Sequence, residues 1–416
     1  MNQRFDLVKK RGKIKIFGNS MFPILVDGDI AHFRALSPHQ VKVNDIICFK
    51  KRNRLISHRV VYSTDVYVIS KGDNNSSPDG RIYHKNILGR IERVERKGQI
   101  TNINDLYLFQ SSIYYKEIEK ITRAFNQKNV DYVILKGLPL YMHYENKHPR
   151  RIYSDCDILV SKRDSKKVEG IFRRNRYERV NTLSLTGDKL EDKAEISFHK
   201  IVDNFPVIFD VHREAVFLMS RVGEVGPLYP KKLLNQYTQN LLDSKVYVFI
   251  ESEKYPVLNS EQLLVYLFLH LFNHNFKGVY RYIFIESVLR SNPDPKKVLN
   301  VIKEYRLETF IYPVLLILKK YFNSALVSQL INSINLSDRK LKYIRQNLSK
   351  INIFQDHDHL GNGEHFRLLF NLSPNPFLVK ILVFFDGKII YSILWIIYSK
   401  IKKKLIHIFP FFSNPF

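Results

Sequence analysis

The order of hydrophobic and polar positions along the chain predicts three regions. From Lys13 to Arg96, short runs of Val, Ile and Phe alternate with turn signals such as Asp27-Gly28 and Asn74-Asn75, which is typical of a β-rich region. The polar cluster from Asn102 to Asp105 is expected to form a linker. From Ser260 onward, long apolar stretches predict a helical region, with Ser260 as the cap of its first helix.

Between these regions, strand-like and helical patterns alternate. The segments from Asp131 to Leu135 and from Pro206 to His212 have the composition of strands, and Ile158 to Val160 is a third apolar run. Helical spacing of apolar residues is found from Ile113 to Asn126 and from Ser165 to Tyr177. We therefore expect a multidomain protein with an all-β domain at 1–100, an α/β domain at 110–255 and a mostly helical part at 256–416.

Two carboxylates, Asp155 and Asp157, stand two residues apart at the start of an apolar run. In a strand, positions i and i+2 point to the same face, so these side chains are expected to lie side by side. Like charges this close repel each other unless a cation lies between them. Mg²⁺ prefers carboxylate oxygens combined with substrate phosphates, so the pair is a candidate magnesium site. An exposed Asp-x-Asp at a strand end is the alternative.

The segments around this pair resemble a known family. The segments Asp131-Tyr-Val-Ile-Leu-Lys136-Gly137, Arg151-Ile-Tyr-Ser-Asp155-Cys-Asp157-Ile-Leu-Val160 and Asp210-Val-His212 follow one another along the chain. This order resembles the uncharacterised bacterial branch of the nucleotidyltransferases of the polymerase-β type, over roughly residues 115–290. The resemblance implies an NTP, ATP first, as substrate and Mg²⁺ as cofactor. By the same resemblance Asp155, Asp157 and Asp210 would hold the metal, or Asp210 would instead activate the acceptor hydroxyl.

Further residues of the matching segments receive roles from the resemblance. Lys136 and Gly137 would approach the phosphates, since glycine allows close backbone approach and lysine supplies a charge. Arg151 would stabilise charge on the transferred phosphoryl group. His212 is expected to be a structural histidine. Better-known members carry Gly-Ser where this chain has Lys-Gly, so a catalytically inactive scaffold is the alternative.

The helical region carries two histidines that share a helix face, His270 and His274. With mostly apolar neighbours and no glutamate between them, they are expected to be buried or interfacial rather than metal ligands. The family resemblance places the segment from His274 to Glu286 beside the nucleotide, with His274 and Arg281 near the substrate.

Composition adds a strong positive charge to this picture. The chain has 66 Lys and Arg against 40 Asp and Glu, a formal net charge of +26. Such a charge attracts polyanions, so nucleotides, nucleic acid and anionic membranes are all candidate partners. The Lys-rich composition of an AT-rich genome is the other explanation. A basic amphipathic tail from Phe377 could lie on an anionic membrane surface, cover the helical part or bind a partner.

The two cysteines and the hydropathy of the chain bear on its location. Cys48 and Cys156 are far apart in sequence, which argues against a disulfide framework and for a reducing compartment. The longest uncharged apolar run, residues 389–399, is shorter than the roughly 18 residues of a membrane span. We expect a cytoplasmic protein that is either soluble or peripheral at the membrane.

The β-rich region contains three boxes of its own. They are Gly18-Asn-Ser20-Met-Phe-Pro-Ile-Leu-Val-Asp-Gly-Asp29, Ser57-His58-Arg59-Val-Val61, and Lys71-Gly-Asp73-Asn-Asn75 followed by Asp79. In this order they resemble the boxes of signal peptidase I, with the histidine found in the archaeal and endoplasmic-reticulum type. The resemblance implies a serine peptidase acting on a peptide or protein. Ser20 would be the nucleophile, His58 the general base, and Asp79 or Asp73 the carboxylate that orients the imidazole.

The N-terminus departs from the signal peptidase pattern. Members of that family carry a membrane anchor before the serine, whereas nineteen mostly hydrophilic residues precede Ser20 here. We therefore expect a soluble relative that does not cleave preproteins at a membrane. The first hypothesis is a bifunctional protein that joins this peptidase to the nucleotidyltransferase. The alternatives are a catalytically inactive binding or regulatory protein, and a nucleic-acid-binding protein that uses the positive charge.

Overall fold

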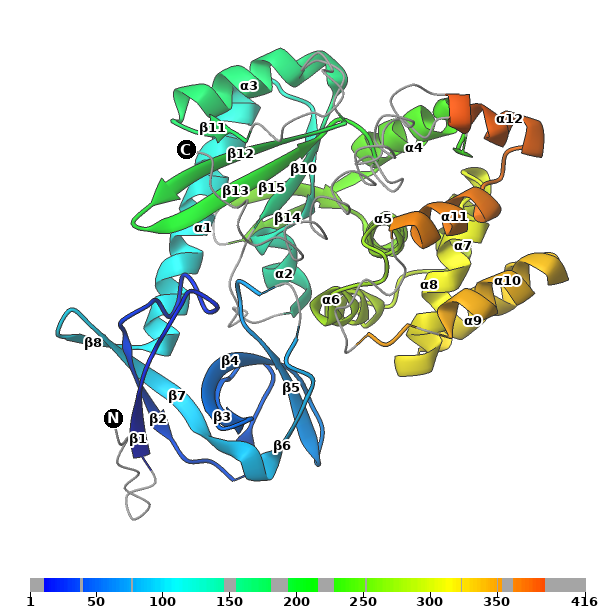
Figure 1. The fold of residues 1–416 in the computed structure, drawn as a ribbon. Coiled ribbons are helices and arrows are strands. Elements are labelled where there is room, and N and C mark those ends of the chain that lie inside the picture. The colour runs from blue at the N-terminus through cyan, green and yellow to red at the C-terminus, as the bar shows by residue number, and fades with distance from the viewer. Residues whose placement is uncertain are drawn as a thin grey trace, which may run out of the picture.

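The computed structural model describes most of the chain, drawn as ribbons in Figure 1: residues 11–37, 40–75, 78–145, 155–180, 194–215, 228–250, 253–322, 324–349, 351–353 and 362–385. A sheet-rich N-terminal region, a mixed α/β region and a helical C-terminal region follow one another, as the sequence predicts. In the part that is described, every helix is too short or too polar to cross a membrane.

The N-terminal region is one eight-stranded antiparallel sheet in the order β1-β2-β7-β3-β4-β5-β6, with β8 paired to β7. Its strands are β1 (Arg11–Lys15), β2 (Ile30–Arg34), β3 (Ile46–Lys51), β4 (Arg54–Ser63), β5 (Tyr67–Lys71), β6 (Arg81–Tyr83), β7 (Ile87–Arg96) and β8 (Gln99–Asn102). The hairpin between β3 and β4 turns at Arg52 and Asn53, whose φ angles are 45° and 59°. Two successive positive φ angles are the geometry of a tight two-residue hairpin, which fixes the register of the strand that carries His58.

The prediction of a linker from Asn102 to Asp105 is wrong. Residues 103–105 form the first turn of α1 (Ile103–Gln127), and Asn102 stands before it with extended φ and ψ of −70° and 144°. Ile103 and Tyr107 are buried against the N-terminal sheet, and this apolar contact outweighs the polar composition that suggested a loop. The helix therefore joins the sheet-rich region to the α/β region within one hydrophobic core.

The middle region is built on a seven-stranded mixed sheet in the order β11-β12-β13-β10-β9-β15-β14. Its strands are β9 (Tyr132–Lys136), β10 (Cys156–Val160), β11 (Glu178–Arg179), β12 (Glu195–Val202), β13 (Phe205–His212), β14 (Lys245–Ile250) and β15 (Glu253–Leu258). Strands β10 and β13 run parallel, whereas β10 and β9 run antiparallel. Helices α1 and α3 (Ser165–Arg174) cover one face, where Phe172 stacks on Phe198 at 4.2 Å and contacts Phe125 and Phe209.

The remaining α-helices lie around and after the middle sheet in sequence. They are α2 (Leu138–Glu145), α4 (Lys231–Asp243), α5 (Ser260–Asn273), α6 (Val279–Leu289), α7 (Pro295–Glu304), α8 (Glu308–Tyr321), α9 (Ala325–Ser333), α10 (Asp338–Leu348), α11 (Asn362–Leu372) and α12 (Phe377–Ile381). The cap of α5 is Asn259 rather than Ser260, because the Asn259 side chain accepts the Gln262 backbone N–H at 2.9 Å. The basic tail beyond Phe385 lies outside the described residues.

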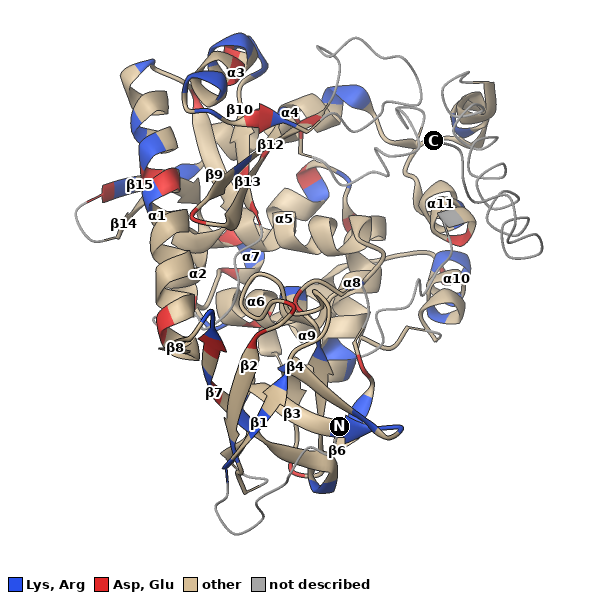
Figure 2. Cartoon of the chain, turned by 60° about the vertical axis from the view of Figure 1, so that its left-hand side comes forward, with Lys and Arg blue, Asp and Glu red and all other residues tan. Residues whose placement is uncertain are grey.

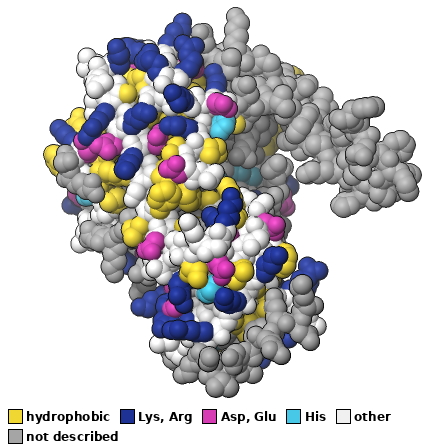
Figure 3. Space-filling model, turned by 90° about the vertical axis from the view of Figure 1, so that its left-hand side faces the viewer, with side chains coloured by type: hydrophobic (Ala, Val, Ile, Leu, Met, Phe, Trp, Pro, Cys, Tyr) yellow, Lys and Arg dark blue, Asp and Glu magenta, His cyan; other side chains and the backbone are white. Residues whose placement is uncertain are grey.

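The charge of the described chain is distributed over several elements. Lys and Arg lie on the outer turns of α1, α3 and α10 (Figure 2). On the face shown in Figure 3, basic side chains are interspersed with acidic and apolar ones rather than gathered in one patch. Nucleic-acid-binding proteins commonly present a continuous basic patch or stripe, and this face does not offer one.

Candidate functional site

The strand register of the middle sheet places four polar residues in one row. Asp157 of β10 is paired with Asp210 of parallel β13 on one side and with Lys136 of antiparallel β9 on the other. Asp210 is in turn paired with Ser197 of β12. Side chains of directly paired residues point to the same face of a sheet, so this row concentrates two acids, a lysine and a hydroxyl at one place.

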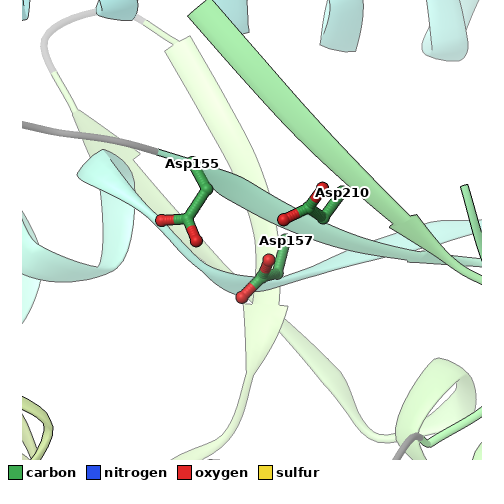
Figure 4. Close-up of side chains that lie close together, drawn as sticks. All are labelled: Asp155, Asp157 and Asp210. Carbon is green, nitrogen blue, oxygen red and sulfur yellow. The ribbon is translucent and has the colours of Figure 1, made fainter. Parts of the chain in front are cut away.

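Asp155 completes a cluster of three carboxylates. It stands two residues before Asp157 and so projects to the same face, and one carboxylate oxygen of each of Asp155, Asp157 and Asp210 lies within 4.8 Å of the others. In Figure 4 the three carboxyl groups lie beside one another near the start of β10. Asp157 is buried, whereas Asp155 and Asp210 are half-buried. Below, these three residues are called the acidic trio.

The acidic trio already holds one cation of the chain. The Lys136 ammonium lies 3.0 Å from Asp155 Oδ2 and 2.8 Å from Asp157 Oδ2. Burial opposes the charge of Lys136, but Asp155 and Asp157 outweigh it and raise the pKa of the lysine well above its usual value. The lysine therefore bridges the two acids as a permanent positive charge.

The carboxylates of the trio have different proton affinities. Burial favours the neutral form of Asp157, but Lys136 and then His212 outweigh it and lower the pKa of Asp157 far below its usual value. Burial, followed by the charge of Asp157, raises the pKa of Asp210 to about 6, although the Ser197 hydroxyl donates to Asp210 at 2.5 Å. Without a further cation, the ionised form of Asp210 is therefore disfavoured.

His212 is not part of the acidic trio, but it lies beside one of its members, Asp157. Its Nε2 is 3.6 Å from Asp157 Oδ1 and its Nδ1 is 3.6 Å from Glu195 Oε2, distances that exceed a hydrogen bond but allow an ion pair. The histidine is buried, and although burial opposes its charge, Asp157 and Glu195 raise its pKa. His212 is thus a buried electrostatic neighbour of two acids.

A small pocket of about 10 Å³, room for one water-sized group, lies beside Lys136 on the side of α2, α5 and α6. The residues that line it are Lys136, Tyr141, Leu267, His270, Tyr280, Arg281, Phe284 and Ile285. Burial, followed by repulsion from His274, lowers the pKa of His270 well below its usual value, so the His270 side chain in the pocket wall is uncharged. Lys136 and Arg281 supply the positive charge of the pocket, and the tyrosines and the phenylalanine supply aromatic surface.

The other phosphate-binding candidates differ in what the structure says of them. Gly137 has a φ of 135°, and a Cβ there would stand 3.0 Å from Cys156 Sγ, so the turn that follows Lys136 requires glycine. Arg151 lies outside the described residues.

In the N-terminal region the structure brings three of the expected residues together. Asp79 Oδ2 lies 2.7 Å from His58 Nδ1, and His58 Nε2 lies 3.0 Å from Ser20 Oγ. A carboxylate at Nδ1 holds the proton on that nitrogen and leaves Nε2 free to accept from the serine hydroxyl. The Ser70 hydroxyl donates to the same Asp79 oxygen at 2.6 Å. This arrangement is below called the serine chain.

The second carboxylate candidate, Asp73, has a different partner. Arg59 donates to it twice, from Nε to Oδ1 and from the guanidinium to Oδ2, both at 2.6 Å. Arg59 also donates to the Tyr107 hydroxyl and lies over the Tyr107 ring at 4.7 Å. Asp73 is therefore paired with Arg59 in a buried ion pair that contacts α1 through Tyr107, and it is not part of the serine chain.

The loop that carries Ser20 is fixed by the loop that carries Asp73. Asn74 donates its backbone N–H to the Ser20 carbonyl at 2.8 Å, and its side chain donates to the Asn19 carbonyl at 3.3 Å. A Cβ at Gly72 would stand 2.7 Å from the Ser20 carbonyl oxygen. The Gly-Asp-Asn-Asn segment thus holds the serine loop through close backbone contact, which only glycine permits.

Several site neighbours are not evident in the sequence. Ser197, Ser70 and Tyr107 have no motif around them, and only the register of β12, the fold of β5 and the packing of α1 bring them to the sites. For Ser197 a faint signal exists, because it lies in an alternating strand that precedes Asp210 by one hairpin.

Comparison with known proteins places the middle of the chain in a family. Residues 97–323 match the family model described as uncharacterised nucleotidyltransferase, which is more than half of the chain. No match was found among curated proteins. The matched range begins between β7 and β8, contains the acidic trio, Lys136 and the pocket, and continues through α8. Because this family model matches more than half of the chain, the protein belongs to the uncharacterised nucleotidyltransferase family.

Proposed function

We propose that the protein transfers a nucleotidyl group from an NTP, ATP in the first instance, to an acceptor, with a divalent cation held by the acidic trio. The observation that supports this proposal is the convergence of three carboxylates within 4.8 Å on adjacent strands of a family fold. Three oxygen ligands of this kind suit Mg²⁺, which completes its shell with water and substrate phosphates.

The residues present fit a cation. Lys136 supplies one positive charge against three carboxylates, and burial, followed by the charge of Asp157, disfavours the ionised form of Asp210, which a cation would favour. When bound, Mg²⁺ would neutralise the phosphates and the developing charge of the transferred group. Asp155, Asp157 and Asp210 would hold it, and Lys136 and Arg281 would orient the phosphates from the adjoining pocket.

Transfer of label from an NTP carrying ³²P at its α-phosphate, in the presence of Mg²⁺, tests the proposal. Wild-type protein should label an acceptor in a cell extract or itself, and Asp157→Asn should abolish the signal. Asp203→Asn is a matched control, because Asp203 lies in an exposed turn with a φ of 48° that asparagine also tolerates. Equal labelling by wild type and Asp157→Asn would reject the proposal.

A second proposal concerns the N-terminal region: we infer that it hydrolyses a peptide bond in a peptide or protein. The supporting observation is the serine chain, in which Ser20, His58 and Asp79 are hydrogen-bonded in sequence. The Ser20 oxygen would attack the scissile carbonyl while His58 Nε2 takes its proton and then passes it to the leaving amine. Water would release the acyl group in the second half of the reaction.

Labelling with a fluorophosphonate probe tests the peptidase proposal. The probe should modify wild-type protein at one site, and Ser20→Ala should remain unlabelled while keeping the same circular dichroism spectrum. A wild-type protein that stays unlabelled, or a Ser20→Ala protein that labels as fast as wild type, would reject it. In that case the N-terminal region would be a binding module.

A further inference from the structure

We propose that Lys136 is an internal counter-ion that the divalent cation displaces, so that metal and nucleotide bind together and each binds poorly alone. The inference rests on the proposed nucleotidyl transfer, because it concerns how that site takes up its ligands. It adds that a side chain of the protein couples the binding of the two ligands.

Lys136 stands at the place of a shared cation. Its ammonium lies 3.0 Å from Asp155 and 2.8 Å from Asp157, which is where a cation shared by these two carboxylates would also lie. Strand pairing fixes this place, since Lys136 is the direct neighbour of Asp157 in β9. A divalent cation and the ammonium cannot both occupy the space between two carboxylates, because like charges at that distance repel strongly.

Lys136 cannot leave the two carboxylates without another partner for its charge. Its side chain is 9% exposed and that of Asp157 is 4% exposed, so either charge would be left buried and unpaired if the ion pair simply opened. An unpaired buried charge is costly. In the absence of nucleotide, a metal ion therefore competes against an ion pair whose lysine has nowhere favourable to go.

The phosphates of a bound nucleotide would be such a partner. Lys136 and Arg281 both line this pocket, so two cationic side chains meet there. A phosphate group placed at the mouth of this small pocket would lie near two cations and would stabilise the lysine away from the acids. The lysine has four rotatable bonds and three donors, so it can turn from carboxylates to phosphates without a change of backbone.

These steps predict reciprocal coupling between the two ligands. If nucleotide removes Lys136 from the acidic trio, metal affinity rises, and by linkage metal raises nucleotide affinity by the same factor. The competing possibility is that the lysine permanently replaces the metal ion. The same experiment separates the two.

Binding of Mn²⁺ to the full-length protein, followed by electron paramagnetic resonance and calorimetry, tests the proposal without any turnover. The nucleotide is the α,β-methylene analogue of ATP, which cannot be cleaved at the bond that nucleotidyl transfer breaks. Wild type should bind Mn²⁺ at least about tenfold more tightly with the analogue than without it, after correction for the Mn²⁺–analogue complex, a factor within the usual range of coupling. This arm needs no variant, so a folding defect cannot obscure it.

Lys136→Met provides the second arm. It should bind Mn²⁺ without the analogue at least about tenfold more tightly than wild type, and the analogue should raise its Mn²⁺ affinity by a smaller factor than in wild type. Lys116→Met, on the exposed side of α1, removes the same charge far from the trio and controls for the change in net charge. It should behave as wild type.

Three results would overturn the proposal. Wild type could bind Mn²⁺ equally well with and without the analogue, or Lys136→Met could show no gain over Lys116→Met. Wild type could also refuse Mn²⁺ even with the analogue while Lys136→Met accepts it, which would make the lysine a permanent replacement. Coupled binding without label transfer would instead reject the proposed function alone.

Discussion

Replacing Asp79 and Asp73 of the N-terminal region one at a time by asparagine should separate effects on catalysis from effects on stability. Asp79→Asn changes the group that orients His58, whereas Asp73→Asn changes the group that neutralises buried Arg59. We predict that the first variant folds normally and reacts slowly. The second should react normally while folded but should unfold far more easily.

The magnitudes follow from the contacts. The amide that Asp79→Asn introduces can present an N–H to His58 Nδ1 and so favour the wrong tautomer, and such a change costs on the order of 10³- to 10⁴-fold in rate. Asp73 makes two charge-assisted bonds of 2.6 Å to Arg59, whose side chain is 6% exposed. Removing one partner of a buried ion pair costs about 3–5 kcal/mol, a large part of the stability of a typical domain.

Two assays on the same preparations measure these effects. The rate of fluorophosphonate labelling in native buffer reports on the serine chain, and urea unfolding followed by circular dichroism reports on stability. Asp65→Asn is the control, because Asp65 is exposed in the turn before β5 and should change neither quantity by more than about 0.5 kcal/mol. Wild-type labelling by Asp79→Asn, or wild-type stability of Asp73→Asn, would refute the reasoning.

Two further predictions concern the middle region. In metal-free buffer, Asp210→Asn should stabilise the protein above pH 6, because the pKa of Asp210 is raised from 3.8 to about 6 and the folded wild type therefore loses stability as the pH rises from about 4 to 6. At about 1.4 kcal/mol for each pKa unit the gain is about 3 kcal/mol at pH 8, and urea titrations at pH 4 and pH 8 should show it vanishing at the lower pH. Gly137→Ala should destabilise by about 1–3 kcal/mol and weaken label transfer, since its φ is 135° and its Cβ would meet Cys156 Sγ at 3.0 Å. Gly98→Ala, with a φ of 80° but open space around it, controls for backbone strain alone, and equal losses in both variants would contradict the contact argument.

Local patterns were enough to predict much of the architecture. Alternation and turn residues predicted the N-terminal sheet, and the i, i+2 spacing of Asp155 and Asp157 predicted a shared face. These features depend on neighbours in sequence. Asp210 lies far along the chain, and only the family pattern linked it to the pair before the structure brought the three together.

What sequence could not supply is the register between distant strands. Nothing local indicates that Lys136 is paired with Asp157, so the lysine was expected near phosphates, whereas it lies between the acids. The first turn of α1 was mistaken for a linker for a similar reason. Its polar residues face outward, while Ile103 and Tyr107 are buried by a sheet that a window of sequence does not contain.

The central claim is that the acidic trio is a divalent-cation site that works with a nucleotide. Anomalous diffraction from crystals grown with Mn²⁺ and the α,β-methylene analogue of ATP tests it most directly. The account predicts a manganese peak in contact with Asp155, Asp157 and Asp210 at about 2.1 Å, with Lys136 turned to the phosphates. An ordered nucleotide with no peak at the trio, and Lys136 still between Asp155 and Asp157, would contradict it.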